Sequence, residues 1–505
     1  MIADLCYTFA IEPSTFDIFL KDEYWINAIM QEELLQFRRN NVWTLVPKPK
    51  RAKIIGTKWI LKNKTDEARC VTKNKARLVA QGYAQVEGVD FDETFAPVVR
   101  LEAIGLLLII SCIQRFKLYQ MDVNGAFLND YLNEEVIYAV QPKGFIDFEY
   151  PKHVYKLNKV LYGLRQAPRA WYERLAIYLS CKGYFRAELT KHYLFTEQMM
   201  NSLLHKSMLM ISYLESEFEM SMVGELSCFL GLQIKQKSES IFISQEKYVK
   251  NIVKKFGLEQ SRHKRTPAAT QVKITKDTNG ARADHKLYRS IIESLLHLTA
   301  SRPDIAYAVG ICVRYQTDPQ MSHLEAVKRI LKYVHGTSDF RILYSYDTTS
   351  ILVGYCDADW AGSTDDRKTT SGGCFFLGNN LISWFSKKQN CVSLSTAEAE
   401  YIAVRSACTQ LVWRKNMLHE YGFTQDIMTL YCDNMNAIDI SKNMVQHSRT
   451  KYIDIRHYFI RELVENKVIT LAHIRSNLQL ADIFIKPLDA NTFEHLRTGL
   501  DACRI

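Results

Sequence analysis

The sequence lacks the features that mark several common classes of protein. None of its 12 cysteines forms a Cys-x-x-Cys pair, which argues against a zinc ribbon and a dense disulfide framework and favours a reducing compartment. Its longest apolar run, residues 103–113, is shorter than the roughly 20 residues of a transmembrane helix, so we expect a buried helix. The first residues contain no basic stretch followed by an apolar core, so we expect no signal peptide, no membrane association and an intracellular, cytoplasmic or nuclear location.

Short-period repeats and low-complexity tracts are absent as well, which leaves a chain of ordinary globular domains. The 505 residues predict three or four of them, at roughly 100–200 residues per domain. The formal net charge of +10 suits a polyanionic partner such as nucleic acid, although many globular proteins without such a partner are equally basic. Charge alone therefore leaves the partner open.

Hydrophobic periodicity predicts both helices and strands along the first two thirds of the chain. In the first part we expect helices at 24–37 and 101–114 and strands at 42–46, 54–62, 76–81 and 117–123. The middle part is expected to be mainly helical, with helices at 248–256, 288–300 and 322–335.

The C-terminal part has the clearest pattern. A Gly-Asn-Asn turn at 378–380 predicts a hairpin, and a capping box from Ser395 to Glu398 predicts the start of a long helix. This alternation of strands and helices describes an α/β (α+β) layer with a mixed sheet. The expected elements, in order, are strands 351–356, 372–377 and 381–386, the long helix, strand 429–432, helix 455–465, strand 468–473 and a short helix 481–486.

Four acidic residues fall where this fold would bring them together. Asp357 and Asp433 each follow a predicted strand, so their carboxylates converge if those strands are neighbours. Glu400 borders the buried face of the long helix, and Asp482 begins the last short helix. Because clustered carboxylates repel one another, their assembly is unfavourable without cations. Two Mg²⁺ ions about 3.5–4 Å apart would relieve the repulsion and support cleavage of a phosphodiester bond.

Simpler interpretations of the acidic residues stay open at this point. Glu398 fits the helix cap, and Asp359, Asp365 and Asp366 fit a solvated turn. Asp433 could serve only as the N-cap of the helix that follows it, which is a common use of aspartate. Spacing alone therefore does not decide for a four-acid site.

Five C-terminal segments resemble the ribonuclease H domain of copia-type retrotransposon Pol polyproteins. The resemblance implies that Asp357, Glu400, Asp433 and Asp482 are catalytic and bind two Mg²⁺ ions. The match to Glu-Tyr-Ile-Ala selects Glu400 over Glu398, and the match to Cys-Asp-Ala-Asp selects Asp357 over Asp359. The segments are Gly-Tyr-Cys-Asp-Ala-Asp-Trp-Ala-Gly at 354–362, Ser-Thr-Ala-Glu-Ala-Glu-Tyr at 395–401, Tyr-Cys-Asp-Asn at 431–434, His-Ser-Arg-Thr-Lys-Tyr-Ile-Asp-Ile-Arg-His at 447–457 and Ala-Asp-Ile at 481–483.

Earlier segments resemble the reverse transcriptase domain of the same family. The resemblance implies that Lys75 and Arg77 meet the triphosphate of a nucleotide, that Asp122 is a catalytic ligand of Mg²⁺, and that Phe127 excludes a ribose 2′-hydroxyl. Composition alone would make Lys75 and Arg77 part of an exposed basic strand and Phe127 a core aromatic. The segments are Lys-Ala-Arg-Leu-Val-Ala-Gln-Gly at 75–82, Tyr-Gln-Met-Asp-Val-Asn-Gly-Ala-Phe-Leu at 119–128 and Leu-Tyr-Gly-Leu-Arg-Gln-Ala-Pro at 161–168.

One motif of the family's polymerases is missing. Their second palm motif is Tyr-Val-Asp-Asp on a hairpin, whereas this chain contains no Tyr-x-Asp-Asp. The motif belongs between the family-like flanks at 193–195 and 218–222, and the intervening residues 196–217 are too few to hold the hairpin. We expect the flanks to lie on adjacent strands of one sheet with exposed edges, and the polymerase to be inactive. A deletion in the transposon and an error in the gene prediction explain the gap equally well.

These patterns together predict a reverse transcriptase fingers–palm region, a helical connection and a ribonuclease H-like mixed-sheet domain. The C-terminal domain, roughly residues 345–490, is expected to fold alone and to cleave the RNA strand of an RNA/DNA hybrid. The alternative is a degenerate, non-enzymatic remnant or a nucleic-acid-binding protein. The expected boundaries are 1–22 for an N-terminal extension, 23–235 for the reverse transcriptase, truncated internally near 196–217, 236–345 for a thumb- or connection-like region, 346–490 for the ribonuclease H-like domain and 491–505 for a C-terminal tail.

Overall fold

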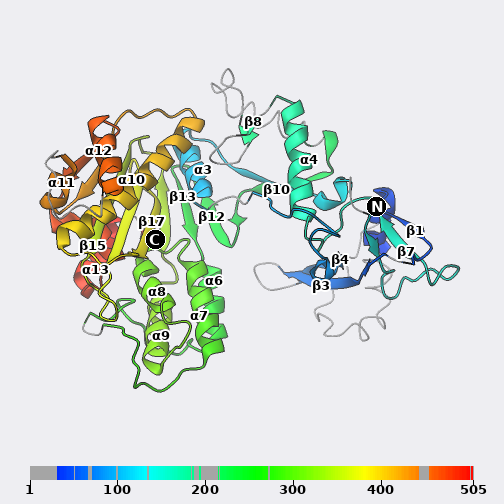
Figure 1. Cartoon of the computed structure of the whole chain (residues 1–505), viewed down its shortest axis with the longest axis horizontal. Coiled ribbons are helices and arrows are strands. Elements are labelled where there is room, and N and C mark those ends of the chain that lie inside the picture. The colour runs from blue at the N-terminus through cyan, green and yellow to red at the C-terminus, as the bar shows by residue number, and fades with distance from the viewer. Residues whose placement is uncertain are drawn as a thin grey trace. The chain divides into compact units, whose positions relative to one another are not determined.

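The structure, a computed structural model, describes residues 31–50, 52–65, 71–97, 101–132, 136–183, 185–186, 193–194, 214, 216–270, 273–442, 454–500 and 502–503. The chain forms two compact units, each built from two stretches of sequence (Figure 1). Unit 1 contains the described parts of Met1–Val98 and Met121–Met222, and unit 2 contains those of Val99–Gln120 and Val223–Ile505. None of the helices among these residues is both long and apolar enough to cross a membrane.

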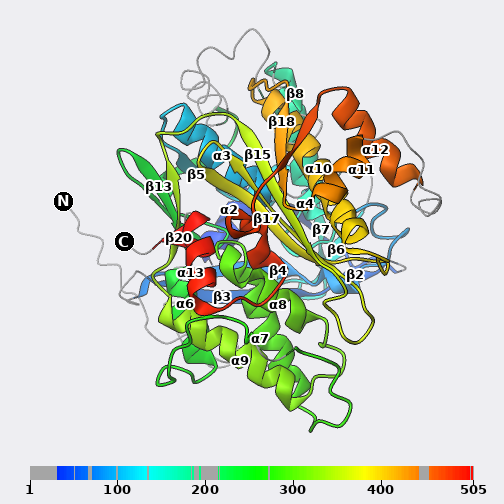
Figure 2. The same ribbon diagram turned by 90° about the vertical axis from the view of Figure 1, so that its left-hand side faces the viewer.

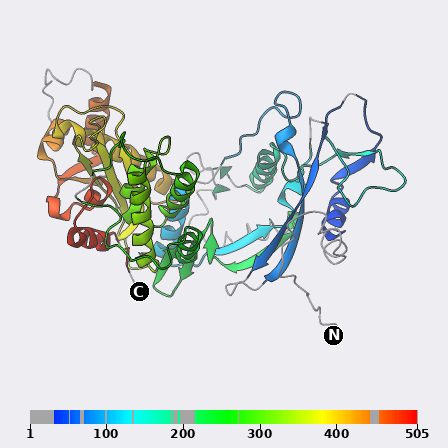
Figure 3. The same ribbon diagram turned by 90° about the horizontal axis from the view of Figure 1, so that it is seen from below.

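Unit 1 combines short sheets with flanking helices. Its elements are α2 (Gln31–Arg39), β1 (Trp43–Val46), β2 (Ile54–Ile55), β3 (Thr57–Thr65), β4 (Val71–Ala80), η2 (Gly82–Ala84), β5 (Tyr119–Val123), η3 (Ala126–Asn129), β6 (Tyr138–Ala139), β7 (Val154–Leu157), α4 (Ala167–Cys181), β8 (Phe185–Arg186), β9 (Tyr193–Leu194) and β10 (Met220–Glu225). A four-stranded sheet has the order β1-β7-β6-β2. Strands β3 and β4 form a long antiparallel ribbon, drawn in blue in Figure 3.

Most strands predicted in this part of the chain are confirmed, with one error in their pairing. β1, β4 and β5 lie where the sequence predicted strands, whereas the strand expected at 54–62 is divided at Gly56 into β2 and β3, which belong to different sheets. Most of the helix expected at 24–37 lies outside the described residues. The two segments that flank residues 196–217 were expected on adjacent strands. Among the described residues β9 pairs with β8, whereas β10 pairs with β5, so that expectation is wrong. Residues 195–213 lie outside the described residues.

A close backbone approach at Gly163 fixes the position of Tyr162 against β4. The Ala80 N–H donates to the carbonyl oxygen of Tyr162 at 2.7 Å. Gly163 has a φ of +89°, and a Cβ atom there would lie 2.3 Å from the carbonyl oxygen of Ala80. Only glycine tolerates both the left-handed backbone and this approach. The Leu-Tyr-Gly segment therefore holds Tyr162 beside the ribbon formed by β3 and β4.

The first part of unit 2 contains a β-sheet and a group of helices. Its elements are α3 (Leu101–Ile113), β11 (Cys228–Phe229), β12 (Leu232–Gln236), β13 (Ser240–Ser244), α6 (Glu246–Lys255), α7 (His285–Leu298), η5 (Pro303–Ile305), α8 (Ala306–Val313), α9 (Met321–Gly336) and β14 (Arg341–Ser345). Helices α6 to α9 lie side by side, in green in Figures 1 and 3. The three helices predicted here are confirmed, but the expectation of a mainly helical region was incomplete. β11, β12, β13 and β14 form a sheet with β20 (Ala502–Cys503), and the alternating Leu232–Gln236 was its local signal.

The last part of unit 2 is a five-stranded mixed sheet covered by helices. Its elements are β15 (Leu352–Asp359), β16 (Thr370–Leu377), β17 (Asn380–Lys388), α10 (Thr396–Glu420), β18 (Met428–Cys432), α11 (Met435–Lys442), α12 (Asp454–Glu465), β19 (Ile469–His473), η6 (Ser476–Leu478), η7 (Leu480–Phe484) and α13 (Ala490–Gly499). The order is β17-β16-β15-β18-β19. β15, β16 and β17 are antiparallel, and β15, β18 and β19 are parallel. Figure 2 shows α10 lying along this sheet with α11 and α12 beside it.

The predicted order of strands in this part is confirmed, as are the hairpin and the helix cap. The Ser395 hydroxyl accepts a hydrogen bond from the Glu398 N–H at 3.2 Å, and the Glu398 carboxylate accepts one from the Leu394 N–H at 2.7 Å. Among the described residues, α11 and α12 both lie between β18 and β19. The sequence analysis predicted α12 and missed the short α11. The short final helix is a 3-10 helix, η7, and the segment expected to be a tail contains α13.

A single hydrophobic core joins the helical part of unit 2 to the mixed sheet. Buried residues of α7, α8 and α9 belong to the same cluster as Phe376 of β16 and Phe484 of η7. Phe493, Leu496 and Leu500, at the end of the chain, complete this cluster. Burial of these three apolar side chains explains why α13 packs against the fold instead of forming a tail.

Candidate active site

Two neighbouring parallel strands bring Asp357 and Asp433 to one edge of the mixed sheet. β15 pairs with β18 in parallel, with Tyr355 opposite Tyr431. Asp357 lies two residues beyond this pair within β15 and is only 4% exposed. Asp433 directly follows β18 and is partly buried. The sequence predicted this convergence correctly, because the carboxyl ends of parallel neighbours lie at the same edge.

Helix α10 adds Glu400 to the same place. Its side chain is 5% exposed, in line with its predicted position at the border of the buried face. The backbone N–H of Ala358 donates to Asp357 Oδ1 at 2.7 Å and to Glu400 Oε1 at 3.1 Å. One N–H group therefore holds the two carboxylates side by side.

The 3-10 helix η7 supplies Asp482, which lies beside Asp357. Hydrogen-bonding contact with Asp482 and with Glu400 is among the causes that raise the pKa of Asp357. Lys486 Nζ lies 2.6 Å from Asp482 Oδ1 and forms an ion pair with it. The position of η7 depends on Gly372 in β16, because a Cβ atom there would lie 2.6 Å from the Cβ of Phe484. This glycine lets the segment that carries Asp482 pack directly on the strand.

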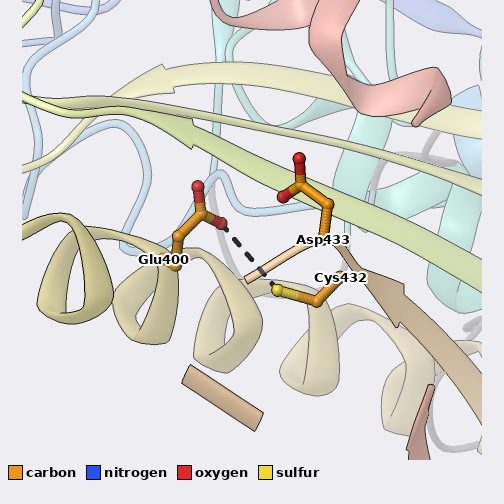
Figure 4. A group of neighbouring side chains, drawn as sticks. All are labelled: Glu400, Cys432 and Asp433. Atoms are coloured by element: carbon orange, nitrogen blue, oxygen red, sulfur yellow. Dashed lines mark hydrogen bonds between the residues drawn. The ribbon is translucent and has the colours of Figure 1, made fainter. Parts of the chain in front are cut away.

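Asp433 completes the cluster on the other side of Glu400. Oxygen atoms of Glu400 and Asp433 and the sulfur of Cys432 all lie within 4.8 Å of one another (Figure 4). The Ser476 hydroxyl donates to Asp433 Oδ2 at 2.8 Å. Asn434, whose Oδ1 accepts a hydrogen bond from the Ala437 N–H, caps α11. The alternative that Asp433 is only a helix cap is therefore wrong, since Asn434 has that role.

Burial and mutual repulsion raise the pKa values of two acids of the cluster. Burial, followed by the neighbouring Asp482 and Glu400, raises the pKa of Asp357 well above its ordinary range. Burial raises the pKa of Glu400 to about 8, with contributions from Cys432 and Asp433, although contacts with Asp357 and the Ala358 N–H act in the opposite direction. The cluster therefore holds protons near neutral pH unless a cation replaces them.

The donor set of this cluster fits divalent metal ions such as Mg²⁺. Asp357 Oδ2 is buried and receives no hydrogen bond from the described residues. A buried carboxylate oxygen without a donor costs free energy, and a cation would satisfy it. Carboxylate oxygens are the ligands that Mg²⁺ prefers, and Asp357, Glu400, Asp433 and Asp482 offer several of them at one place.

Two other acids of this region, Asp365 and Asp366, have contacts outside the cluster. Asp359 is partly buried at the end of β15, whereas Asp365 and Asp366 are exposed, as expected for a turn. Asp365 accepts hydrogen bonds from the Lys276 N–H and the Tyr315 hydroxyl, and Asp366 forms an ion pair with Lys388 at 2.6 Å. Glu398 caps α10, as predicted.

In unit 1, three of the predicted nucleotide-binding and catalytic residues lie around Tyr162. The Arg77 guanidinium carbon lies 4.0 Å above the centre of the Tyr162 ring, and the Phe127 ring centroid lies 5.0 Å from it. Burial raises the pKa of Tyr162, with Asp122 among the charges that act on it. Asp122 is exposed on β5. Lys75 lies two residues before Arg77 on β4, so both side chains leave the same face of the ribbon.

Several residues of these sites were missed by the sequence analysis. Lys486 follows Asp482 by four residues in an Ala-Asp-Ile-Phe-Ile-Lys segment, which was a usable signal for an ion pair. Cys432 directly precedes Asp433 and was available from the same motif. Ser476 carried no local signal, because it meets Asp433 only through the fold. Tyr162 lies in the family-like segment 161–168, but nothing local indicated that its ring would contact Arg77 and Phe127.

The order of strands, the long covering helix and the four acids at one sheet edge define a ribonuclease H-like domain. Residues 40–270 match a family model described as reverse transcriptase (RNA-dependent DNA polymerase). Two curated relatives are the retrovirus-related Pol polyproteins from transposon TNT 1-94 of Nicotiana tabacum, 36% identical over 92% of this chain, and from transposon RE1 of Arabidopsis thaliana, 36% identical over 98%. The chain belongs to the family of copia-type retrotransposon Pol polyproteins.

The match covers part of these polyproteins only. The chain spans 37% of the tobacco relative and 35% of the Arabidopsis relative. Among solved structures, that of the foamy viral protease-reverse transcriptase in complex with dsDNA is similar in fold, with a TM-score of 0.50 and 13% identity. The similarity covers 88% of this chain and 82% of that chain. The predicted fold class, a reverse transcriptase with a ribonuclease H-like domain, is thereby confirmed.

Proposed function

We propose that this chain cleaves the RNA strand of RNA/DNA hybrids at the cluster of Asp357, Glu400, Asp433 and Asp482. The observation that carries the proposal is the convergence of these carboxylates from segments far apart in sequence, with the buried Asp357 Oδ2 left without a hydrogen-bond donor among the described residues. Carboxylates placed together in this way are unfavourable unless they hold cations.

The four acids would hold two Mg²⁺ ions. When bound, such ions activate a water molecule and stabilise the leaving oxygen of a phosphodiester. The chain's own groups prepare the site. The Ala358 N–H aligns Asp357 and Glu400, and the Ser476 hydroxyl orients Asp433. Glu400 releases its proton to solvent before it can act as a ligand, since its pKa is raised to about 8.

An RNA/DNA hybrid suits the cluster as a substrate, because the cluster would act on the sugar-phosphate backbone and would not have to recognise a particular base sequence. Double-stranded nucleic acid containing RNA is bound mainly through phosphates and 2′-hydroxyl groups. The net charge of +10 favours such a polyanion in general.

We propose further that the reverse transcriptase region does not polymerise DNA. The chain has no Tyr-x-Asp-Asp, so Asp122 is the sole palm aspartate that its motifs supply. A two-metal polymerase site with one aspartate holds its ions poorly. Residues Lys75, Arg77 and Phe127 would then be remnants of a nucleotide site.

Cleavage of a labelled RNA/DNA hybrid by the purified full-length chain tests the nuclease proposal. We expect Mg²⁺-dependent cleavage of the RNA strand that stops when EDTA is added. Asp357→Asn should abolish it, while Asp359→Asn, which changes an acid two residues away on the same strand, should retain most of it. A folded protein that binds Mg²⁺ and leaves hybrids uncut would favour the remnant alternative.

A further inference from the structure

One side of the acid cluster contains the thiol of Cys432, a type of ligand that Mg²⁺ does not favour. Figure 4 shows the Glu400 carboxylate beside the sulfur of Cys432, with the Asp433 carboxylate close to both. Cys432 Sγ lies 4.0 Å from Glu400 Oε2, and one donor atom from each of the three residues lies within 4.8 Å of the other two. A single ion among them would need only a small closure, because zinc lies about 2.3 Å from sulfur and about 2.0–2.2 Å from carboxylate oxygen.

A second observation is a buried acid beside Glu400 that has an unpartnered oxygen. Asp357, held beside Glu400 by the shared Ala358 N–H, is 4% exposed, and its Oδ2 receives no hydrogen bond from the described residues. Asp433 is only partly buried and forms the solvent side of this group, whereas Cys432 is fully buried.

The chemistry of the three donors separates them from a plain acid cluster. Thiolate sulfur is a soft ligand that favours Zn²⁺ and related cations, whereas Mg²⁺ takes oxygen ligands almost exclusively. Zn²⁺ accepts a mixed sulfur and oxygen set and often keeps a fourth position for water. We propose that Glu400, Cys432 and Asp433 form a zinc site that overlaps the proposed magnesium site.

Zinc would therefore act as an inhibitor of the proposed nuclease. Its binding would replace the proton of the Cys432 thiol and the proton that Glu400 holds near neutral pH, and both protons would pass to solvent. The bound ion occupies Glu400 and Asp433, so the cluster can no longer hold its two magnesium ions. Inhibition should be relieved as the Mg²⁺ concentration is raised, because both ions compete for the same carboxylates. This inhibitory consequence rests on the proposed function, while the binding of zinc does not.

Cobalt reports directly on the thiolate ligand. Co²⁺ replaces Zn²⁺ in such sites, and a cobalt–thiolate bond gives a charge-transfer band in the near ultraviolet. We expect the full-length chain to show this band on titration with Co²⁺ and to lose it when Zn²⁺ is added. Cys432→Ala should remove the band and weaken Zn²⁺ binding, measured by calorimetry, by about tenfold or more.

Cys374→Ala is the matched control, because Cys374 is equally buried in the same sheet on β16 and lies outside the cluster. This variant should keep the band and the wild-type affinity. Asp433→Asn should weaken zinc binding yet keep the band, since the sulfur ligand remains.

The results separate this inference from the nuclease proposal. A cobalt band that depends on Cys432, in a protein that cuts no hybrid, supports the zinc site and rejects the nuclease. Magnesium-dependent cleavage by a wild-type protein that shows no thiolate band at saturating Co²⁺ overturns the zinc site, whatever the variants do. The zinc site is also overturned if the cobalt band persists in Cys432→Ala and a thermal melt shows that this variant is folded.

Discussion

Lys486 Nζ lies 2.6 Å from Asp482 Oδ1, so the acid cluster carries one cation of its own. Asp482 is largely buried, whereas the Lys486 side chain is 41% exposed, which weakens the pair by solvent screening. The lysine offsets part of the repulsion in the metal-free protein. It must also compete with any metal ion for the same carboxylate.

Replacement of Lys486 by methionine, which keeps most of the aliphatic stem, should have two opposite effects. The affinity for Mg²⁺ should rise, by an amount on the order of 1 kcal/mol or about fivefold, because the competing ammonium group is gone. The metal-free protein should melt at a lower temperature, because Asp482 loses its partner. Calorimetric titration with Mg²⁺ and thermal melts in EDTA measure the two effects.

Lys388→Met is the control for this prediction. Lys388 forms an ion pair of the same length, 2.6 Å, with Asp366, outside the cluster. Its loss should leave the affinity for Mg²⁺ unchanged. Equal effects of the two variants on Mg²⁺ binding would mean that Lys486 acts only through the general charge of the protein.

The two glutamates of α10 should respond differently to neutralisation. Glu400→Gln removes a buried carboxylate of the cluster and should abolish hybrid cleavage. Glu398→Gln touches only the helix cap, where its carboxylate accepts the Leu394 N–H, and should cost about 1 kcal/mol or less of stability. Cleavage assays and thermal melts of both variants are needed. Tolerance of Glu400→Gln together with loss of cleavage in Glu398→Gln would show that the assignment on this helix is wrong.

The metal-free protein should lose stability as the pH rises. The pKa of Glu400 is raised by burial from 4.5 to about 8, so between these values the folded state binds more protons than the unfolded state. The free energy of unfolding therefore falls across this window. Asp357, whose pKa is also raised, contributes in the same direction.

Thermal melts in EDTA between about pH 5 and about pH 8 test this dependence. The melting temperature of the wild type should fall with pH, and that of Glu400→Gln should fall less. Saturating Mg²⁺ should reverse the trend, because metal binding requires the ionised carboxylates. A steeper fall in Glu400→Gln than in the wild type would mean that the Glu400 carboxyl is not the source of the dependence.

The sequence predicted those parts of the fold and site that depend on local pattern. The strands before Asp357 and Asp433 could be predicted from their hydrophobic pattern and from turn residues. Adjacent parallel strands have their carboxyl ends at the same edge of the sheet, so the two acids were expected to lie close together. Ser476 was missed because only the fold brings it to Asp433, whereas the ion pair of Lys486 had a local signal, its four-residue spacing from Asp482, that was not used. The sheet around β13 was missed because β14, one of the two neighbours of β13, and the edge strand β20 are far along the chain, although Leu232–Gln236 carried a local signal. The domain boundaries and the catalytic roles of the acids stay predictions.

The purified chain should not extend a primed template. Asp122 is exposed on β5, and the chain has no Tyr-x-Asp-Asp to supply further acids. Incorporation of deoxynucleotides in Mg²⁺ should stay at the level of a reaction without protein. Asp122→Asn serves as the control, because real polymerase activity would fall in this variant, whereas a contaminating polymerase would be unaffected. Incorporation that depends on Asp122 would contradict the prediction.

The shared core of unit 2 bears on whether the ribonuclease H-like part folds by itself. The complete order of strands and helices and the places of the four acids predict that residues 345–490 fold alone. Phe376 and Phe484 of this segment, however, pack in one cluster with Ile291, Val309 and Leu331 of the preceding helices. A fragment cut at 345 and 490 exposes this apolar face and also loses α13. We therefore now expect the isolated fragment to aggregate or to melt without cooperativity.

A longer fragment, residues 223–505, restores the helices α6 to α9 and α13, although not α3, and should melt more cooperatively and at a clearly higher temperature than the short one. Calorimetry and size-exclusion chromatography of both fragments measure the difference. Replacing Phe493 and Leu496 by alanine in the longer fragment should lower its stability by about 2–5 kcal/mol for each buried side chain removed, because both belong to the shared core. Leu478→Ala, an exposed position near the same end of the chain, should have little effect. Cooperative melting and hybrid cleavage by the short fragment would show instead that the mixed sheet is independent of the helices packed against it.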